Sequence, residues 1–311
     1  MKKKPLEKVE IGKNLSVIHN SGNVMTLYAE NVYVGWELTL LLTSDRHHDS
    51  VHCDRDLELK HLEEAKKRNA YVIDVGDLFD AMQGKYDPRR TYDDLRPEYK
   101  KTNYLDKIVE DAAKFYGPYV DRILMMGRGN HDVSVLKNTG TDPLGNLVHR
   151  LNTYPWMGHV QAGGYGGWVR VLCTISDTQR ESVLIKYFHG AGGGGPVTRG
   201  VIQTNRQAVY LPDADVVVNG HTHDAWYVPI ERERLTNQGV VITDIQHHVR
   251  TPTYNDDYRD GSGGWFVETG KAPRPRGGVW LRLSCDQGTP PSATARRVRQ
   301  HIKIEPILAI E

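Results

Sequence analysis

Five short polar motifs in this sequence each follow an apolar run of the kind that forms a buried strand. In chain order they are Asp45-x-His47, Gly76-Asp77-x-x-Asp80, Gly129-Asn130-His131-Asp132, His189 and Gly220-His221-x-His223. Carboxylate, imidazole and amide groups together suit divalent cations, and an imidazole beside a carboxylate can donate a proton while the carboxylate orients it. The motifs therefore predict a metal site with an acid–base group next to it.

Taken singly, each motif also has an ordinary structural interpretation. Asp45-x-His47 is compatible with a solvated loop, and the turn at residues 129–132 is compatible with a helix N-terminus capped by Asn130 or Asp132. In favour of a site, two residues two apart at the end of a strand point to the same side. The carboxyl ends of neighbouring parallel strands also meet at one edge of a sheet, which would bring the motifs together.

The elements needed to position these motifs can be predicted from the pattern of apolar residues. A hairpin is expected around the turn at residues 20–23, and Asp54 is expected to cap a helix that ends near Asn69. Further strands are expected at 38–44, 71–75, 122–127, 168–173, 182–188, 213–219, 225–230, 239–245, 279–283 and 298–304, and helices at 102–115 and after Asp142. This alternation predicts an α/β protein.

Two long loops have functional and structural interpretations that the sequence leaves open. Residues 81–101 could form a rim in which Tyr86, Arg89 and Arg90 meet a phosphorylated substrate, or an excursion used for oligomer contacts. Residues 251–278, with Tyr254, Tyr258 and Trp265, could line a substrate groove or be plain connection. The basic stretch from residue 271 to 304 could meet phosphates or be a solvated edge.

Composition limits the classes of protein that fit. Lys and Arg number 40 and Asp and Glu 39 in 311 residues, so no global charge favours nucleic acid or a membrane surface. The three cysteines, Cys53, Cys173 and Cys285, form no C-x-x-C pair, which argues against a disulfide framework and a zinc–thiolate site. No signal peptide or membrane-spanning run is present. We therefore expect a soluble, cytoplasmic protein without membrane association.

With the five motifs in this order, the chain resembles the calcineurin-like metallophosphoesterase superfamily. The signature D-x-H, G-D-x-x-D, G-N-H-[DE], H and G-H-x-H is met in full over about residues 38–225. The resemblance implies an α/β fold, a four-layer α/β/β/α sandwich of two mixed sheets. The tails lie outside this resemblance, but we expect a single domain over residues 1–311, with an N-terminal hairpin in 1–37, the motif-bearing core in 38–225, and second-sheet strands, loops and a basic segment in 226–311.

The resemblance further implies a site with two divalent cations. One cation would take Asp45, His47, Asp77 and His223, and the other Asp77, Asn130, His189 and His221, so that Asp77 bridges. A hydroxide shared by the cations would attack phosphorus. His131 would stabilise the developing charge or protonate the leaving oxygen, with Asp80 as the residue that orients it. Manganese is the first candidate metal, and iron, zinc, nickel and cobalt also suit these ligands.

One departure from the family pattern bears on the substrate. Ala81 stands where the protein phosphatases of the superfamily carry an arginine that clamps phosphate. The sequence therefore favours a phosphodiesterase of the branch that includes DNA repair nucleases, acting on DNA, RNA or a nucleotide; Arg128, Arg46 and Arg199 are candidates to contact the phosphate. A phosphomonoesterase is the alternative, and a non-catalytic metal-binding scaffold is less favoured because every ligand and His131 remain. A homo-oligomer is left open.

Overall fold

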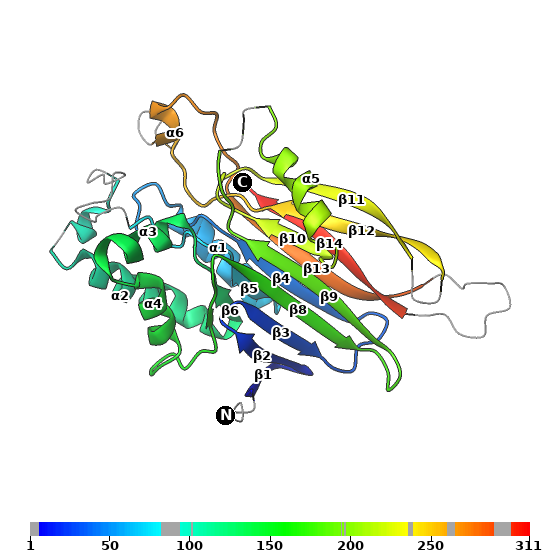
Figure 1. Cartoon of the computed structure of the whole chain (residues 1–311). Helices are drawn as coiled ribbons and strands as arrows, with labels where there is room; N and C mark the ends of the chain where they lie inside the picture. Colours follow the sequence, from blue (N-terminus) through cyan, green and yellow to red (C-terminus); the bar gives the residue numbers. More distant parts are fainter. Residues whose placement is uncertain are drawn as a thin grey trace.

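The structure of the chain is a computed structural model that describes residues 6–81, 94–100, 102–193, 195, 197–235, 239–259, 265–288 and 300–311. Two mixed β-sheets lie against each other, with helices on the outside (Figure 1). The residues Tyr86, Arg89 and Arg90, expected on a rim, lie outside the described residues. In the described part, no helix has the length and apolarity needed to cross a membrane.

The six-stranded sheet carries the first three motifs. In spatial order its strands are β14 (Gln300–Ile310), β13 (Gly277–Gln287), β4 (Glu37–Thr43), β5 (Tyr71–Asp74), β6 (Ile123–Met126) and β7 (Gln161–Ala162). Strands β4 to β7 are parallel, whereas β13 runs antiparallel to both β4 and β14. Both faces of β5 and β6 are buried, which explains why these strands are apolar runs without alternation.

The eight-stranded sheet carries the other two motifs. Its spatial order is β1 (Lys8–Gly12), β2 (Leu15–Ser21), β3 (Val24–Ala29), β8 (Gly166–Thr174), β9 (Arg180–Phe188), β10 (Val216–Asn219), β12 (Val241–Arg250) and β11 (Trp226–Leu235). The expected hairpin is formed by β2 and β3. Strand β10 lies between β9 and β12 and is parallel to both.

Helices cover the outer face of the six-stranded sheet. They are α1 (Arg55–Lys67), α2 (Tyr104–Tyr116), α3 (Asn130–Thr139) and α4 (Pro143–Leu151), with short 3-10 helices η1 (Pro97–Tyr99) and η2 (Gly117–Arg122). The capping residues expected from the sequence are in place, because Asp54 accepts a hydrogen bond from Leu57 N and Asp142 from Gly145 N. On the other side lies α5 (Val201–Tyr210), whereas the short α6 (Trp265–Glu268) lies near the strand ends, where Phe266 packs against His223.

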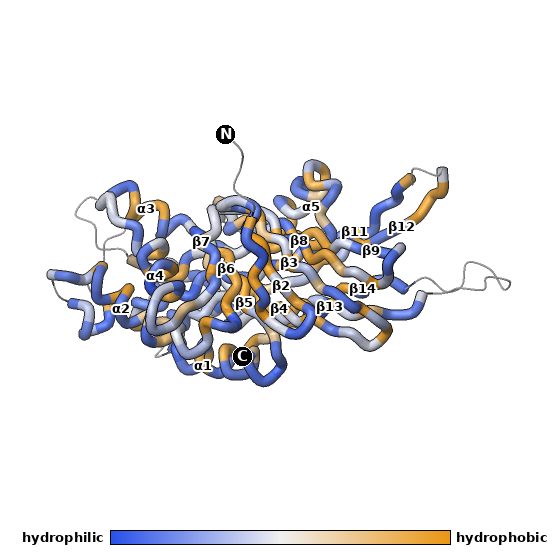
Figure 2. The backbone as a smooth tube through the Cα atoms, turned by 90° about the horizontal axis from the view of Figure 1, so that it is seen from below, coloured by the Kyte–Doolittle hydropathy of each residue, from blue (hydrophilic) through white to orange (hydrophobic). Residues whose placement is uncertain are grey.

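Alternation along the strands divides the core into two parts. Leu40 and Leu42 of β4 pack between the sheets, whereas Leu41 faces the helices together with Leu62 of α1. In Figure 2 the apolar segments lie mostly along the central strands, and polar segments surround them.

The eight-stranded sheet is covered more thinly on its outside. Val217 of β10 points away from the inter-sheet core and is nevertheless fully buried, and Gln246 of β12 donates to the carbonyl oxygens of Leu211 and Ala214, just beyond α5. Helix α5 thus supplies a fourth layer beside β10 and β12 (Figure 1). The expected fold class, α/β with two mixed sheets between helices, is confirmed.

Candidate metal centre

Each of the five motifs begins where a strand ends. Asp45 and His47 follow β4, Asp77 and Asp80 follow β5, Asn130 and His131 begin α3 after β6, His189 follows β9, and His221 and His223 follow β10. Because β4, β5 and β6 are parallel, and β9 and β10 are parallel in the facing sheet, the strand ends of both sheets meet at one place.

One group of potential ligand atoms is formed by Asp45, His47 and His223. The Nε2 atoms of His47 and His223 lie 3.3 Å apart, and His223 Nε2 lies 3.5 Å from Asp45 Oδ1. The three side chains bring their ligand atoms within 4.8 Å of one another. This is the spacing expected of groups that share one small cation.

A second group lies beside the first. His189 Nε2 is 3.1 Å from both Asp77 Oδ2 and Asn130 Oδ1, and His221 Nδ1 is 2.7 Å from the same Asn130 oxygen. His189 Nε2 also lies 3.9 Å from Asp45 Oδ1 of the first group. The structure therefore brings together all seven side chains that the sequence placed at the metals, in two adjoining groups.

His131 and Asp80 stand at the edge of this cluster. His131 Nδ1 lies 2.8 Å from the carbonyl oxygen of Asp80, to which it must donate, and 3.1 Å from the carboxylate Oδ1. The same Oδ1 lies 3.0 Å from His47 Nδ1. His131 Nε2 is left facing the centre, 3.9 Å from Asp77 Oδ2. Asp80 therefore holds two imidazoles, one from each of two motifs.

The electrostatics of the cluster favour positive charge. Burial alone would raise the pKa of Asp45, but the imidazoles of His189, His223 and His47 lower it well below its ordinary value. Burial likewise lowers the pKa of His47, yet the hydrogen bond and charge of Asp80 outweigh it and raise the pKa to about 10. The carboxylates thus stabilise a cation at the imidazoles, and a divalent metal can take that place from protons.

The backbone at the ligand positions is strained. Five of the seven have positive φ: Asp45 (49°), His47 (47°), Asp77 (57°), His221 (74°) and His223 (58°). Residues other than glycine rarely adopt this region, and such strain is found mostly at functional sites. The tight turns are what aim alternate side chains from each strand end into the centre.

Two motif glycines are required by close approach. A Cβ at Gly129 would overlap the carboxylate of Asp77, and a Cβ at Gly220 would stand 2.6 Å from Asp45 Oδ2. The ligand carboxylates thus occupy the space that a side chain would fill, which gives the glycines of G-N-H and G-H-x-H a direct structural role.

The side chains present fit divalent cations. Asp45 Oδ1 is buried and has no hydrogen-bond partner among the described residues, although it points toward His189 and His223. The paired Nε2 atoms of His47 and His223 would both be satisfied by one cation between them. Carboxylate, imidazole and amide ligands together do not select one metal among manganese, iron, zinc, nickel and cobalt.

Two buried carboxylates that support the site were not assigned this role from the sequence. Asp49 accepts hydrogen bonds from the backbone N–H of Asp80 at 2.6 Å and of Ala81 at 2.9 Å. Asp132 accepts from the backbone N–H of Gly129 at 2.8 Å and of Asp77 at 3.2 Å. The motif G-N-H-D flagged Asp132, whereas nothing in the sequence distinguishes Asp49 from an ordinary loop acid.

The structure does not support Arg46 as a phosphate ligand. Its guanidinium is buried, donates to Asp74 Oδ2 at 2.7 Å and pairs with Glu58 at 3.3 Å, so the prediction was wrong. Because Asp45 and His47 point into the centre, the residue between them points into the core. Arg128 pairs with Asp142 at 2.6 Å. Arg199 is exposed in the turn before α5, and its carbonyl oxygen accepts from Trp226.

Comparisons with known proteins give similarities of structure only. No family model and no curated protein matches the sequence. Solved structures that resemble the chain include GAP50, the anchor in the inner membrane complex of Plasmodium (TM-score 0.37, 11% identity, 85% of this chain and 88% of that one). Another is a metallophosphoesterase from Sphaerobacter thermophilus (TM-score 0.32, 13% identity, 86% and 88%).

A third is a predicted phosphoesterase from Streptococcus pneumoniae (TM-score 0.30, 10% identity, 88% of this chain and 98% of that one). Two of these three structures carry phosphoesterase names. At these TM-scores the similarities carry no argument of their own. The functional assignment therefore rests on the order of the motifs and on the geometry of the strand ends.

Proposed function

We propose that this protein is a metal-dependent phosphoesterase whose substrates are phosphodiesters of nucleic acids or nucleotides. The observation that carries the proposal is the meeting of seven ligand side chains in two adjoining groups, with His131 beside them. Divalent cations bound there would lower the pKa of water and polarise the phosphoryl oxygens. Manganese is the metal we propose to test first.

The chain's own residues would divide the remaining tasks. Asp77 lies 3.1 Å from His189 of the second group and offers a carboxylate oxygen within 4.8 Å of a ring nitrogen of His47 of the first group, so it is the residue suited to bridge two cations. Because His131 Nδ1 donates to the Asp80 carbonyl, its Nε2 is aimed at the place where a phosphate would lie. There His131 can stabilise charge or give a proton to the leaving oxygen.

The arginine contacts favour a diester over a monoester. A monoester dianion is commonly gripped by a fixed arginine, which binds two of its oxygens at once. At this site Ala81 replaces that arginine, Arg46 is buried in the core, and Arg128 is paired with Asp142. A diester carries one charge at the phosphate and depends less on such a clamp.

The test compares two chromogenic esters on purified protein. After treatment with a chelator and reconstitution with manganese, iron, zinc, nickel or cobalt in turn, the rate would be measured with bis-p-nitrophenyl phosphate and with p-nitrophenyl phosphate. We expect metal-dependent turnover with a higher kcat/KM for the diester. A clear preference for the monoester would contradict the diesterase assignment, and no turnover with any metal would favour a metal-binding scaffold.

A further inference from the structure

Arg250 is a buried arginine at the end of β12, against the loops that carry two of the metal ligands. The residue is only 2% exposed. Its guanidinium donates from Nη1 to the carbonyl oxygen of Gly220, the residue before His221. A Cβ at Gly190, the residue after His189, would stand 3.5 Å from the same Nη1. The guanidinium therefore lies directly beside both ligand loops.

Most of the hydrogen-bonding capacity of this guanidinium is unused. Nε of Arg250 is buried and has no partner in the described part of the chain. Nη2 faces Gly200, where a Cβ would stand 3.1 Å away, and it makes no hydrogen bond with a described residue, but solvent reaches it. A buried donor without a partner is costly, because it has given up its bond to water and gained none in exchange. Arg250 thus has donors left for a ligand that the described residues do not supply.

The charge of Arg250 also lacks a carboxylate partner among the residues that the structure describes. Asp45 and Asp224 are the acids whose charges act on it, but Asp45 belongs to the metal centre and Asp224 is paired with Arg274. Burial lowers the pKa of Arg250 to about 10, so the guanidinium stays charged at neutral pH. Buried charges are ordinarily paired, and an unpaired buried cation therefore favours the binding of an anion.

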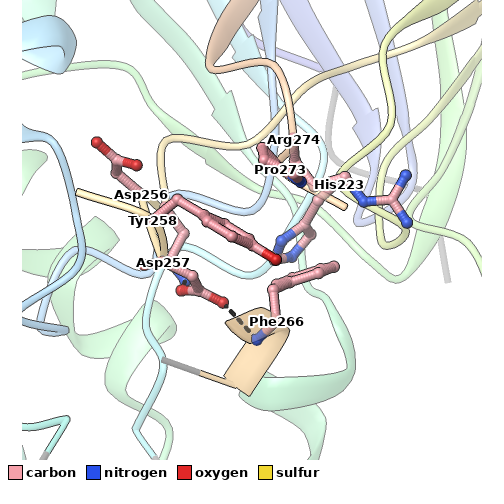
Figure 3. A pocket seen from close by; sticks show the side chains of 8 residues that line it. His223, Asp256, Asp257, Tyr258, Phe266, Pro273 and Arg274 are labelled. Atoms are coloured by element: carbon pink, nitrogen blue, oxygen red, sulfur yellow. Dashed lines mark hydrogen bonds between the residues drawn. The ribbon is translucent and has the colours of Figure 1, made fainter. Parts of the chain in front are cut away.

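Other arginines near the centre already have carboxylate partners. Arg274 lies at the wall of the small pocket beside His223 (Figure 3), and a carboxylate holds it there. Arg46 and Arg128 are likewise paired with carboxylates. Arg250 differs from these three, because its one hydrogen-bond partner is a neutral carbonyl oxygen.

The surroundings of Arg250 add to the positive potential. Its guanidinium lies over the ring of Trp226, 5.3 Å from the ring centre, and the indole N–H of Trp226 donates to the carbonyl oxygen of Arg199 at 3.1 Å. Arg199 is exposed and immediately precedes Gly200, the N-cap of α5. The first turn of α5 contains no acidic residue, so the partial positive charge of the helix N-terminus is not neutralised there. A negatively charged group is favoured at this end of α5.

We propose that Arg250 binds a second phosphate of the substrate, a neighbour of the phosphate that is held at the cations. The proposal rests on the proposed phosphodiesterase function and narrows its substrates to those with more than one phosphate, such as polynucleotides. Val249 packs between the sheets, so Arg250 approaches the ligand loops from the outer face of the eight-stranded sheet. His131 faces the cations from α3, after β6 of the other sheet. The two residues are therefore placed for two different phosphates.

The test compares two ligands that differ by one phosphate. Calorimetry would measure the binding of thymidine 3′,5′-bisphosphate and of thymidine 5′-monophosphate to the full chain reconstituted with manganese. We expect wild type to bind the bisphosphate roughly tenfold to a hundredfold more tightly, because one hydrogen-bonded charge pair is added. Added salt should reduce this ratio. The ratio is the readout, because damage to the metal centre alone would weaken both ligands.

Two variants of Arg250 and one control carry the comparison. In Arg250→Gln the ratio of affinities should fall toward one, whereas Arg250→Lys, which keeps the charge, should retain part of it. Arg234→Gln is the matched control and should keep the wild-type ratio, because Arg234 on β11 is exposed and already paired with Asp244 at 3.0 Å. Melting temperatures establish that each variant is folded.

The outcomes separate the second-phosphate site from the catalytic function. Equal affinities for the two ligands in wild type, or an Arg250→Gln variant that keeps the wild-type ratio, would overturn the site. If phosphodiesters are cleaved in a metal-dependent way while the affinities are equal, the phosphoesterase stands without this site. If no ester is cleaved but the preference for the bisphosphate depends on Arg250, the anion site stands and the proposed function fails.

Discussion

The buried carboxylate of Asp49 offers a sharp test of how the centre is held. It lies in the loop after β4, is fully buried, and accepts hydrogen bonds from Asp80 N at 2.6 Å, from Ala81 N at 2.9 Å and from the hydroxyl of Tyr104. Ala81 has a φ of 48°, so this turn is strained as well as buried. The perturbation is Asp49→Asn, which keeps the shape and removes one acceptor.

The magnitude follows from the hydrogen bonds that Asp49 makes. In Asp49→Asn an NH₂ group replaces the oxygen that faces the N–H of Ala81, so a charge-assisted bond is lost and a buried donor is stranded. Such a change lowers the free energy of unfolding by about 2–4 kcal/mol. Asp80 then loses part of the support that fixes it between His47 and His131. Loss of such a supporting contact commonly lowers metal affinity or activity by roughly 10–100-fold.

The assay measures kcat for the diester as a function of metal concentration, at a temperature where melting curves show the variant folded. We expect a lower kcat and a metal requirement shifted to higher concentration. Asp121→Asn, an exposed carboxylate paired with its neighbour Arg122, is the matched control and should change neither. A variant that loses stability but keeps wild-type kcat and metal dependence would refute a positioning role for Asp49.

Three further predictions concern the centre and its surroundings. His131→Ala should lower kcat by about 10²–10⁴-fold while elemental analysis finds the metal content of wild type; unchanged turnover would refute the assigned role. Glu58→Gln, which strands buried arginine and histidine partners, should lower the free energy of unfolding by roughly 3–5 kcal/mol in urea titrations. The exposed Glu64→Gln is the control and should leave the free energy of unfolding nearly unchanged. Burial raises the pKa of Glu58, but these partners outweigh it and lower the pKa below 4.5. The difference in unfolding free energy between wild type and Glu58→Gln is therefore fully present above pH 4.5 and is lost as the pH falls through the lowered pKa. A difference that grows in acid would contradict this. Gly129→Ala, whose Cβ would overlap a ligand carboxylate, should abolish metal uptake in a titration that Gly22→Ala, with open space around it, leaves unchanged.

The meeting of the motif side chains at the strand ends could be predicted from the sequence because its signal is local. A motif such as Gly220-His221-x-His223 follows an apolar run, and the carboxyl ends of parallel strands all lie at the same edge of the sheet. The same alternation places Arg46 in the core, because the residue between two side chains that face the centre must face away from it. The prediction that Arg46 contacts phosphate failed because the alternation of side-chain directions was applied only to Asp45 and His47.

Other parts of the site depend on contacts between distant segments. The pocket lined by Asn255, Phe266 and Arg274 joins segments that are apart in the sequence, and no short-range pattern predicts that they meet. Asp49 likewise supports Asp80 across 31 positions of the chain. Secondary structure can be predicted from periodicity, but the partner of a buried carboxylate follows only from the packing of several elements.

Buried carboxylates hold the strained turns in place through hydrogen bonds to the backbone. Asp74 Oδ1 accepts from the N–H of Gly76 at 3.0 Å, Asp132 from that of Asp77 at 3.2 Å, and Asp49 from those of Asp80 and Ala81. Four backbone N–H groups in the turn after β5, those of residues 76, 77, 80 and 81, are thus held by carboxylates that are not predicted metal ligands. A residue with positive φ stores about 1–3 kcal/mol and persists only where its surroundings hold it.

The supporting carboxylates therefore have a task distinct from that of the ligands. Cations bound at the centre would pull the ligand side chains together, but they exert no direct hold on the backbone N–H groups behind them. Acceptors such as Asp49 and Asp132 hold those N–H groups through hydrogen bonds that do not involve the cations. We therefore expect that removal of the metal leaves the carboxylate charges of the site uncompensated but does not change the positions of the strand ends.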